Sequence, residues 1–230
     1  MRSWDQQNGL GAVVPAMLSG GLSGWPYWGP DIAGFADAAQ TADQASVGQR
    51  AQQPEGEKEL WMRWVQLGAL SPTMRDMYGM QHDPVDLWTD DQTLAVFRGY
   101  ARLHSALKPY LYRYAQIAHQ RGLPILRPLF LNYPTDTTTF DLADEYLIGD
   151  EVLVAPVLEP QQVTRRLYLP AERWRDYWTG TVYQGPGWVV VAAPMQRVPL
   201  FVRADAAIVL PKPDELDLPG DSQLTYSTDR

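Results

Sequence analysis

A change of pattern at Gly122 constrains the fold of this chain more than any other feature. Before it, residues 92–121 carry apolar side chains at the three-to-four spacing of a long amphipathic helix. After it, short runs rich in β-branched and aromatic residues are separated by Pro, Gly and Asp, as in an all-β region. An α/β first part followed by an all-β second part predicts two domains rather than alternation throughout.

The first part of the chain contains at most two units in which a strand is followed by a helix. Residues 10–23 predict a short apolar helix that glycines end, and residues 22–35 predict a strand and a loop. Residues 36–58 are polar, which predicts a surface loop, and residues 59–69 predict an amphipathic helix. In the long helix that follows, Pro109 is expected to cause a kink or a break. A closed barrel of eight such units takes about 250 residues, so barrel-type structure here would lack most of its barrel.

The composition excludes several classes of function. The formal net charge of −8 disfavours a nucleic-acid partner, because neutralising phosphates requires clustered Lys and Arg. No apolar run approaches the roughly 18 residues of a membrane span, so we expect no membrane partner. The absence of cysteine excludes thiol nucleophiles, thiolate metal sites and disulfides. Without a metal motif, a phosphate loop or a dinucleotide fingerprint, we expect no metal and no cofactor.

Aromatic side chains are concentrated in one stretch, residues 22–35 (LSGWPYWGPDIAGF), around the carboxylate of Asp31. Pyranose rings have apolar faces that stack on aromatic rings, and their hydroxyl groups need polar partners at the edge of the same surface. The stretch therefore suits a sugar pocket. Aromatic-rich strands are also common in protein cores, and the residues alone leave these two interpretations open.

Five motifs occur in order along the chain: LSGGLSGWPYWGPDIAGF, LWMRWVQLGALSPTMRD, LKPYLYRYAQIAHQRGLPILRPLFLNYPTD, YLIGDEVLVAPVL and LYLPAERWRDYWTG. Together they resemble the C-terminal part of a family 31 glycoside hydrolase, a family that includes α-glucosidases, α-xylosidases and sulfoquinovosidases. The resemblance covers nearly all of residues 3–210. It implies the C-terminal part of a (β/α)8 barrel in residues 1–123 and a β-sandwich in residues 124–212, with residues 213–230 as a tail or linker.

The resemblance also implies a mechanism, retaining hydrolysis of an α-glycoside by two carboxylates about 5–5.5 Å apart. We expect neither carboxylate in this chain, because the family's nucleophile lies on a strand further upstream. Its acid/base Asp precedes a tryptophan that best matches Trp4, so Asp5 is expected to be a surface carboxylate or a helix cap. The chain alone is then expected to be inactive, with the carbohydrate substrate and the missing N-terminal part of the same enzyme as its partners.

The resemblance implies a wall of the substrate pocket in this chain. Its Asp-Ile-Gly-Gly-Phe motif lines the subsite of the cleaved sugar, and here Ala33 replaces the first glycine. An arginine at the end of the last barrel strand is a further functional position in barrel enzymes. Direct substrate contact and a structural ion pair remain alternative roles for the charged residues. The predicted substrate-binding residues are Asp31, Phe35, Trp28, Arg75 and Asp76.

One departure from the family pattern concerns recognition of the sugar. Met77 stands where the family usually has a histidine that hydrogen-bonds the substrate, and a thioether cannot donate such a bond. Either the sugar differs or His82 takes over the role, although His82 is also well explained as a solvated loop residue. His104 and His119, on the long helix, are expected to be packing or surface residues.

Three hypotheses follow. The first is the C-terminal part of an α-glucosidase-like retaining glycosidase, which acts on terminal α-linked sugars of oligosaccharides or glycosides. The second is a carbohydrate-binding or structural module without catalysis. The third is a catalytically altered homologue, suggested by Met77 and Ala33. If the barrel is incomplete, residues 10–22 and 60–70 should expose apolar faces, and residues 1–123 alone should be less soluble than residues 124–212.

Overall fold

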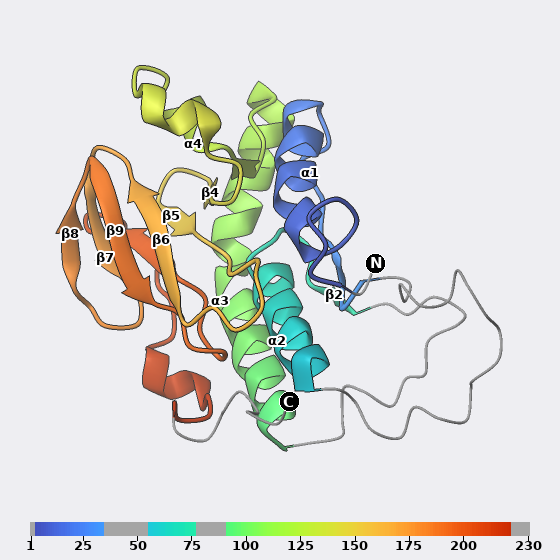
Figure 1. The fold of residues 1–230 in the computed structure, drawn as a ribbon. Coiled ribbons are helices and arrows are strands. Elements are labelled where there is room, and N and C mark those ends of the chain that lie inside the picture. Colours follow the sequence, from blue (N-terminus) through green and yellow to red (C-terminus); the bar gives the residue numbers. More distant parts are fainter. Residues whose placement is uncertain (1–2, 35–54, 77–90, 222–230) are drawn as a thin grey trace, which may run out of the picture.

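The computed structural model describes residues 3–34, 55–76 and 91–221. The first part holds three long helices, α1 (Leu10–Leu22), α2 (Glu55–Ala69) and α3 (Asp91–Arg121), and two short strands, β1 (Asp31–Ile32) and β2 (Arg75–Asp76). Figure 1 shows the sandwich strands on one side of α3, with α1 and α2 on the other. The described part of the barrel is thus one parallel pair of strands with three helices.

The predicted long helix is confirmed, with one difference. α3 continues through Pro109 as a single helix of 31 residues, so this proline does not split it. The helix ends at Arg121, just before Gly122, whose φ of 70° lies in the left-handed region and whose N–H donates to the carbonyl oxygen of Ala118. The pattern change in the sequence therefore coincides with a glycine that ends the helix.

The second part is built from eight strands and three short helices. The strands are β3 (Leu126–Arg127), β4 (Tyr146–Ile148), β5 (Val152–Val154), β6 (Thr164–Leu169), β7 (Arg173–Asp176), β8 (Val182–Gln184), β9 (Gly187–Ala192) and β10 (Leu200–Arg203). The helices are α4 (Leu129–Asn132), η3 (Thr137–Asp141) and η4 (Pro213–Leu216). An antiparallel six-stranded sheet runs in the order β3-β4-β5-β10-β7-β8, and β6 pairs with β9 in a second sheet. The predicted arrangement of a partial barrel followed by a sandwich is confirmed.

The six-stranded sheet is buried on both faces at its centre. Every residue of β4 and β5 is buried. Side chains alternate along these strands, so Ile148 and Val152 join the core of the helices, whereas Leu147 and Leu153 join a second core with β6 and β9. The sheet is therefore the middle layer of three, between the helices and the β6–β9 pair.

Two expectations about exposed segments are wrong. Residues 59–71 are buried throughout, because α2 packs against α3 and β1, and because its polar side chains bond loops of the sandwich. Residues 213–230 were expected to be a tail or linker, but η4 (Pro213–Leu216) at the start of this segment packs on α3, with Leu216 fully buried. Polar contacts hold it there, such as the 2.7 Å bond from the Tyr177 hydroxyl group to the Pro211 carbonyl oxygen.

Candidate functional site

Strands β1 and β2 bring two predicted site residues together. They pair in parallel, with Asp31 opposite Arg75 and Ile32 opposite Asp76. Arg75 Nη2 forms an ion pair with Asp31 Oδ1. The Asp31 side chain is largely covered, whereas half of the Arg75 side chain is exposed. Because the strands are parallel and these two residues are paired in register, both functional groups lie at the same level of the pair. In barrel enzymes, the active site lies at the C-terminal ends of the strands.

Close backbone contacts explain how these two strands meet. A Cβ atom at Gly29 would lie 2.0 Å from the carbonyl oxygen of Thr73, so only glycine allows the two segments to approach this closely. Ser71, which is fully buried, spans the bend before β2, and its hydroxyl group bonds the carbonyl oxygens of Gly68 and Thr73. The close approach at Gly29 and the bonds of Ser71 together hold the two strands side by side.

The turn after β1 contains the residue that departs from the family motif. Ala33 has a φ of 69°, in the left-handed region where glycine is favoured, and Gly34 follows with a φ of 79°. The Gly34 N–H closes the turn by bonding the Asp31 carbonyl oxygen at 2.8 Å. The alanine therefore adopts a glycine-like backbone without abolishing the turn that follows Asp31.

The aromatic side chains in residues 22–35 lie in different environments. Trp28 is partly buried and packs against the core of the helices. Tyr27 is 61% exposed, and its hydroxyl group donates a 3.1 Å bond to the Ala115 carbonyl oxygen on α3. Trp25 is 73% exposed. The stretch thus combines one partly buried ring with two exposed rings.

Several predicted positions lie outside the described residues: Phe35, Met77 and His82. Asp76 is described and exposed, beside Arg75 on β2. Asp5 is exposed, and its Oδ1 accepts the backbone N–H groups of Gln7 and Asn8 in the turn before α1. The N-cap of α1 is Gly9, without a side-chain cap, so Asp5 is a surface carboxylate that closes a turn and does not cap the helix.

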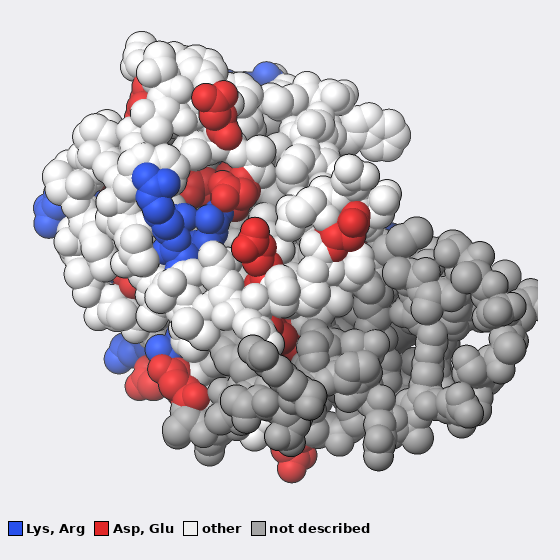
Figure 2. Space-filling model, in the orientation of Figure 1, with Lys and Arg blue, Asp and Glu red and all other residues white. Residues whose placement is uncertain are grey.

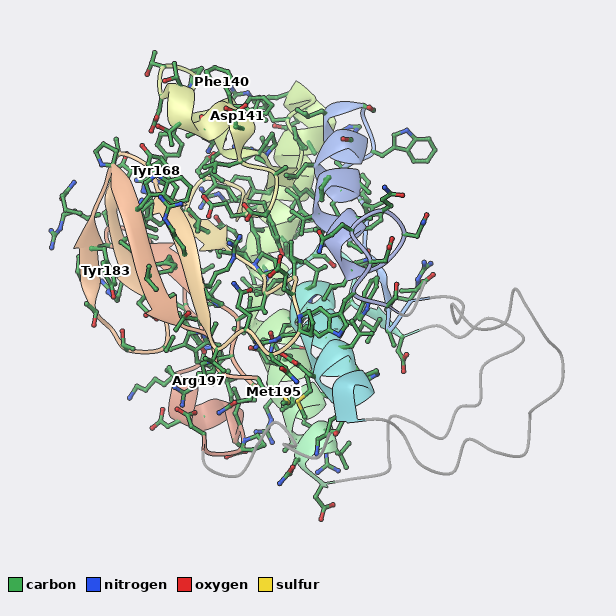
Figure 3. The ribbon with its side chains drawn as sticks, in the orientation of Figure 1. Phe140, Asp141, Tyr168, Tyr183, Met195 and Arg197 are labelled. Atoms are coloured by element: carbon green, nitrogen blue, oxygen red, sulfur yellow. The ribbon has the colours of Figure 1, made fainter. Side chains whose placement is uncertain are left out.

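Sequence reasoning missed a buried polar cluster on α2. The Arg63 guanidinium donates to the carbonyl oxygens of Ala193 at 2.9 Å and of Pro194 and Arg197 at 3.1 Å. Gln66 Nε2 donates to the Met195 carbonyl oxygen at 2.7 Å. Figure 3 labels Met195 and Arg197 at the end of the sandwich that meets the helices. A charged residue inside the apolar run LWMRWVQL was the available signal.

The described ranges show neither a metal cluster nor a membrane span. No group of three His, Cys, Asp or Glu side chains there could hold a metal ion. No helix in those ranges is long and apolar enough to cross a bilayer.

His104, on α3, has its pKa lowered by burial, and its Nδ1 lies 2.9 Å from the Ala69 carbonyl oxygen at the end of α2. Because a carbonyl oxygen can only accept, Nδ1 carries a proton in this contact, and burial favours the neutral form of the ring. On the face in Figure 2, acidic and basic side chains of the described part are intermingled.

Comparison with known proteins identifies the family. The family model "Glycosyl hydrolases family 31 TIM-barrel domain" matches residues 3–114, and "Glycosyl hydrolase family 31 C-terminal domain" matches residues 122–208. This chain belongs to glycoside hydrolase family 31. The two matches follow each other in the order that the sequence motifs predicted.

Curated members of family 31 are similar to most of the chain. Alpha-glucosidase 2 of Bacillus thermoamyloliquefaciens is 33% identical over 198 residues, which are 86% of this chain and 23% of that protein. Sulfoquinovosidase of Escherichia coli (strain K12) is 36% identical over 206 residues, which are 88% of this chain and 28% of that protein. The chain thus spans about a quarter of the length of these relatives.

Solved structures of family 31 share the fold. The family 31 dextranase of Flavobacterium johnsoniae, complexed with glucose, matches with a TM-score of 0.77 and 35% identity over 90% of this chain and 24% of that one. The family 31 alpha-xylosidase from a soil metagenome, complexed with xylose, matches with a TM-score of 0.75 and 29% identity over 92% of this chain and 32% of that one.

Proposed function

We propose that this chain is the C-terminal part of a retaining α-glycosidase that releases terminal α-linked sugars from oligosaccharides or glycosides. The observation that carries the proposal is the parallel pair β1–β2, which holds Asp31 and Arg75 at one edge within a family 31 fold. The chain's share of its relatives, about a quarter, supports the view that the rest of the barrel is supplied by further polypeptide.

In this proposal the chain binds the sugar and the missing part of the enzyme performs the chemistry. Asp31 Oδ1 is held by Arg75, and Oδ2 accepts no hydrogen bond from a described residue. We propose that Oδ2 accepts a hydroxyl group of the sugar, with Phe35, Trp28, Arg75 and Asp76 completing the wall. The nucleophile and the acid/base, about 5–5.5 Å apart in a retaining enzyme, belong to polypeptide outside this chain. The proposed organisation is a barrel portion in residues 1–123, a sandwich in residues 124–212 and a tail in residues 213–230.

The first test is an assay of the chain alone with an aryl α-glucoside. We expect no turnover, because neither catalytic carboxylate is assigned to the chain. Robust hydrolysis would contradict the assignment of the carboxylates to other polypeptide, and its loss in Asp5→Asn or Asp31→Asn would identify that residue as one of them.

The second test gives the chain a complete barrel. A chimera in which this chain replaces the matching part of Alpha-glucosidase 2, 23% of its length, is expected to hydrolyse the glucoside. Asp31→Asn in the chimera should lower kcat/KM about 100-fold, since a charge-assisted bond to the sugar is lost at the reacting centre. Asp141→Asn, at the far end of the molecule in Figure 3, is the matched control and should leave kcat/KM unchanged. Equal effects of both variants would refute the binding role of Asp31.

The alternative function is a carbohydrate-binding module without catalysis. The exposed rings of Trp25 and Tyr27 favour it, because exposed aromatic groups are suited to stack on sugars. Calorimetry of the chain with maltose and isomaltose separates the two functions. An incomplete pocket should bind neither sugar at micromolar strength, whereas a module should bind at least one, and Trp25→Ala should then abolish binding.

A further inference from the structure

A cavity of about 290 Å³ lies away from the β1–β2 edge, where the last turns of α3 meet β3, α4 and the turn between β4 and β5. Its size is near the lower end of small-molecule sites, about 300 Å³. It could hold one ring with its substituents. The residues that line it are Ile117, Arg121, Leu123, Arg127, Leu131, Asn132 and Asp150.

Arg127 is a buried cation whose guanidinium is held rigidly at this cavity. The residue is 3% exposed. Its Nε donates to the Pro124 carbonyl oxygen at 2.8 Å, and its Nη1 contacts Asn132 Oδ1 and Asp150 Oδ1. The Tyr114 ring lies 5.2 Å from the guanidinium carbon. Nη2 donates to no described residue, so one edge of a fixed guanidinium is left for a ligand.

Asp150 balances the charge of one guanidinium at the cavity, that of Arg127. Its Oδ1 accepts from Arg127 and, at 2.9 Å, from Asn132 Nδ2, whereas its Oδ2 accepts from the Tyr114 hydroxyl group at 3.0 Å. Both carboxylate oxygens are thus engaged by protein groups. The carboxylate serves as the internal partner of Arg127.

Arg121 adds a second cation to the same cavity. It is the last residue of α3, it is exposed, and it makes no ion pair with a described residue. The lining therefore contains two guanidinium groups and one carboxylate, an excess of one positive charge in a chain with a formal net charge of −8. Three aliphatic side chains, those of Ile117, Leu123 and Leu131, complete the surface.

We propose that this cavity binds a small organic carboxylate. Arg121 and Nη2 of Arg127 hold the carboxylate group, since guanidinium groups match its planar geometry. The lining is more polar than apolar, so the body of the ligand, one aromatic or sugar ring, makes only limited contact with the three aliphatic residues. The site is built from α3, β3, α4 and the β4–β5 turn, so it is independent of the proposed glycosidase function.

The test titrates the full chain with four probes and follows the backbone amide signals by NMR. Benzoate and glucuronate carry a carboxylate on an aromatic ring and on a sugar ring, benzamide is the neutral counterpart of benzoate, and inorganic phosphate is an oxyanion without a body. We expect benzoate or glucuronate to bind with a dissociation constant on the order of 1 mM. The signals of Leu131 and Asn132 should shift, and benzamide and phosphate should bind at least tenfold more weakly.

Two variants on the same helix complete the test. Arg121→Met should weaken binding about tenfold or more, because one of the two cations is removed. Arg98→Met removes the same charge from an exposed position roughly 34 Å away along the helix axis, and binding should be unchanged. The proposal is overturned if neither benzoate nor glucuronate shifts the signals near the cavity, or if benzamide or phosphate binds as tightly as these two probes. It is also overturned if both variants weaken binding equally.

Discussion

The sandwich strands and the barrel strands differ in how completely the chain covers them. Every residue of β4 and β5 is buried, between the helices on one face and the β6–β9 pair on the other. By contrast, both residues of β2 are exposed, and two large rings just before β1, Trp25 and Tyr27, are 73% and 61% exposed. The central sandwich strands are thus covered on both faces within this chain, in part by its helices, whereas the described barrel strands have surface left for further partners.

Two arginine side chains show the same contrast between the regions. Arg63, at the interface of α2 with the sandwich, is 2% exposed and donates to several carbonyl oxygens. Arg75, at the edge of β2, is half exposed and pairs with one carboxylate. The cost of removing an arginine should therefore differ strongly between the two regions.

The largest expected effect is that of removing one tryptophan from each region. Trp174 is fully buried in the sandwich, and its indole N–H donates to the Pro170 carbonyl oxygen at 3.0 Å. We expect Trp174→Ala to lower the free energy of unfolding by about 3–5 kcal/mol. Trp25→Ala should change it by less than about 0.5 kcal/mol. Urea unfolding of the full chain measures both, and similar losses in the two variants would break the comparison.

The next effect concerns the interface between α2 and the sandwich. Arg63→Met keeps the aliphatic volume but leaves Glu59, 2% exposed, without its cation 3.6 Å away. We expect a loss of about 3 kcal/mol in the free energy of unfolding, because a buried charge loses its partner. The double variant Glu59→Gln/Arg63→Met should recover part of this loss. Arg98→Met, on an exposed face of α3, is the control; a loss below about 1 kcal/mol in Arg63→Met would contradict the prediction.

A third effect depends on pH and tests the link between the two sheets. Burial raises the pKa of Glu145 from 4.5 to about 8, although its carboxylate accepts the Tyr168 N–H from β6. Between these two values the folded chain holds a proton that the unfolded chain has lost. The free energy of unfolding should therefore fall as pH rises through this window and level off above the folded pKa.

Glu145→Gln removes this titration while it keeps a neutral side chain of similar shape. Relative to the original chain, the variant should gain about 1–3 kcal/mol of stability between about pH 5 and about pH 8.5. Urea midpoints across this range measure the gain. Parallel pH profiles of the two proteins would show that Glu145 does not titrate in the window.

The smallest effect is expected at the candidate site itself. Arg75→Met removes a half-exposed ion pair, and such pairs contribute about 0–1 kcal/mol to stability. The melting temperature of the chain should therefore change little, whereas the chimera with a complete barrel should lose activity. A large loss of stability would mean that the pair supports the strands and would weaken its proposed role in binding.

The sequence was informative wherever local periodicity and local packing agree. The helix before Gly122 and the strands after it were predictable, because the apolar spacing changes from a helical to an alternating period there. The pairing of Asp31 with Arg75 was one of the alternatives that the motifs raised. Which of these residues contact a sugar remains a prediction.

Other features could not be predicted because they depend on partners far apart in the sequence. Nothing local indicates that Arg63 bonds carbonyl groups about 130 positions away, or that η4 lies on α3. The continuation of α3 through Pro109 could not be predicted either. Packing of the helix on both sides can outweigh the loss of one hydrogen bond at a proline.

The shared sheet has a consequence for how such a chain can be divided. Tyr146, Ile148, Val152, Val154 and Leu200 all point toward the helices, so a product that starts after Gly122 would present them to water. Against our first expectation, we expect residues 124–212 to aggregate when made alone. Gly122 marks a change of architecture, yet a gene cut there would separate two halves of one core, and the chain should be recombined between homologues only as a whole.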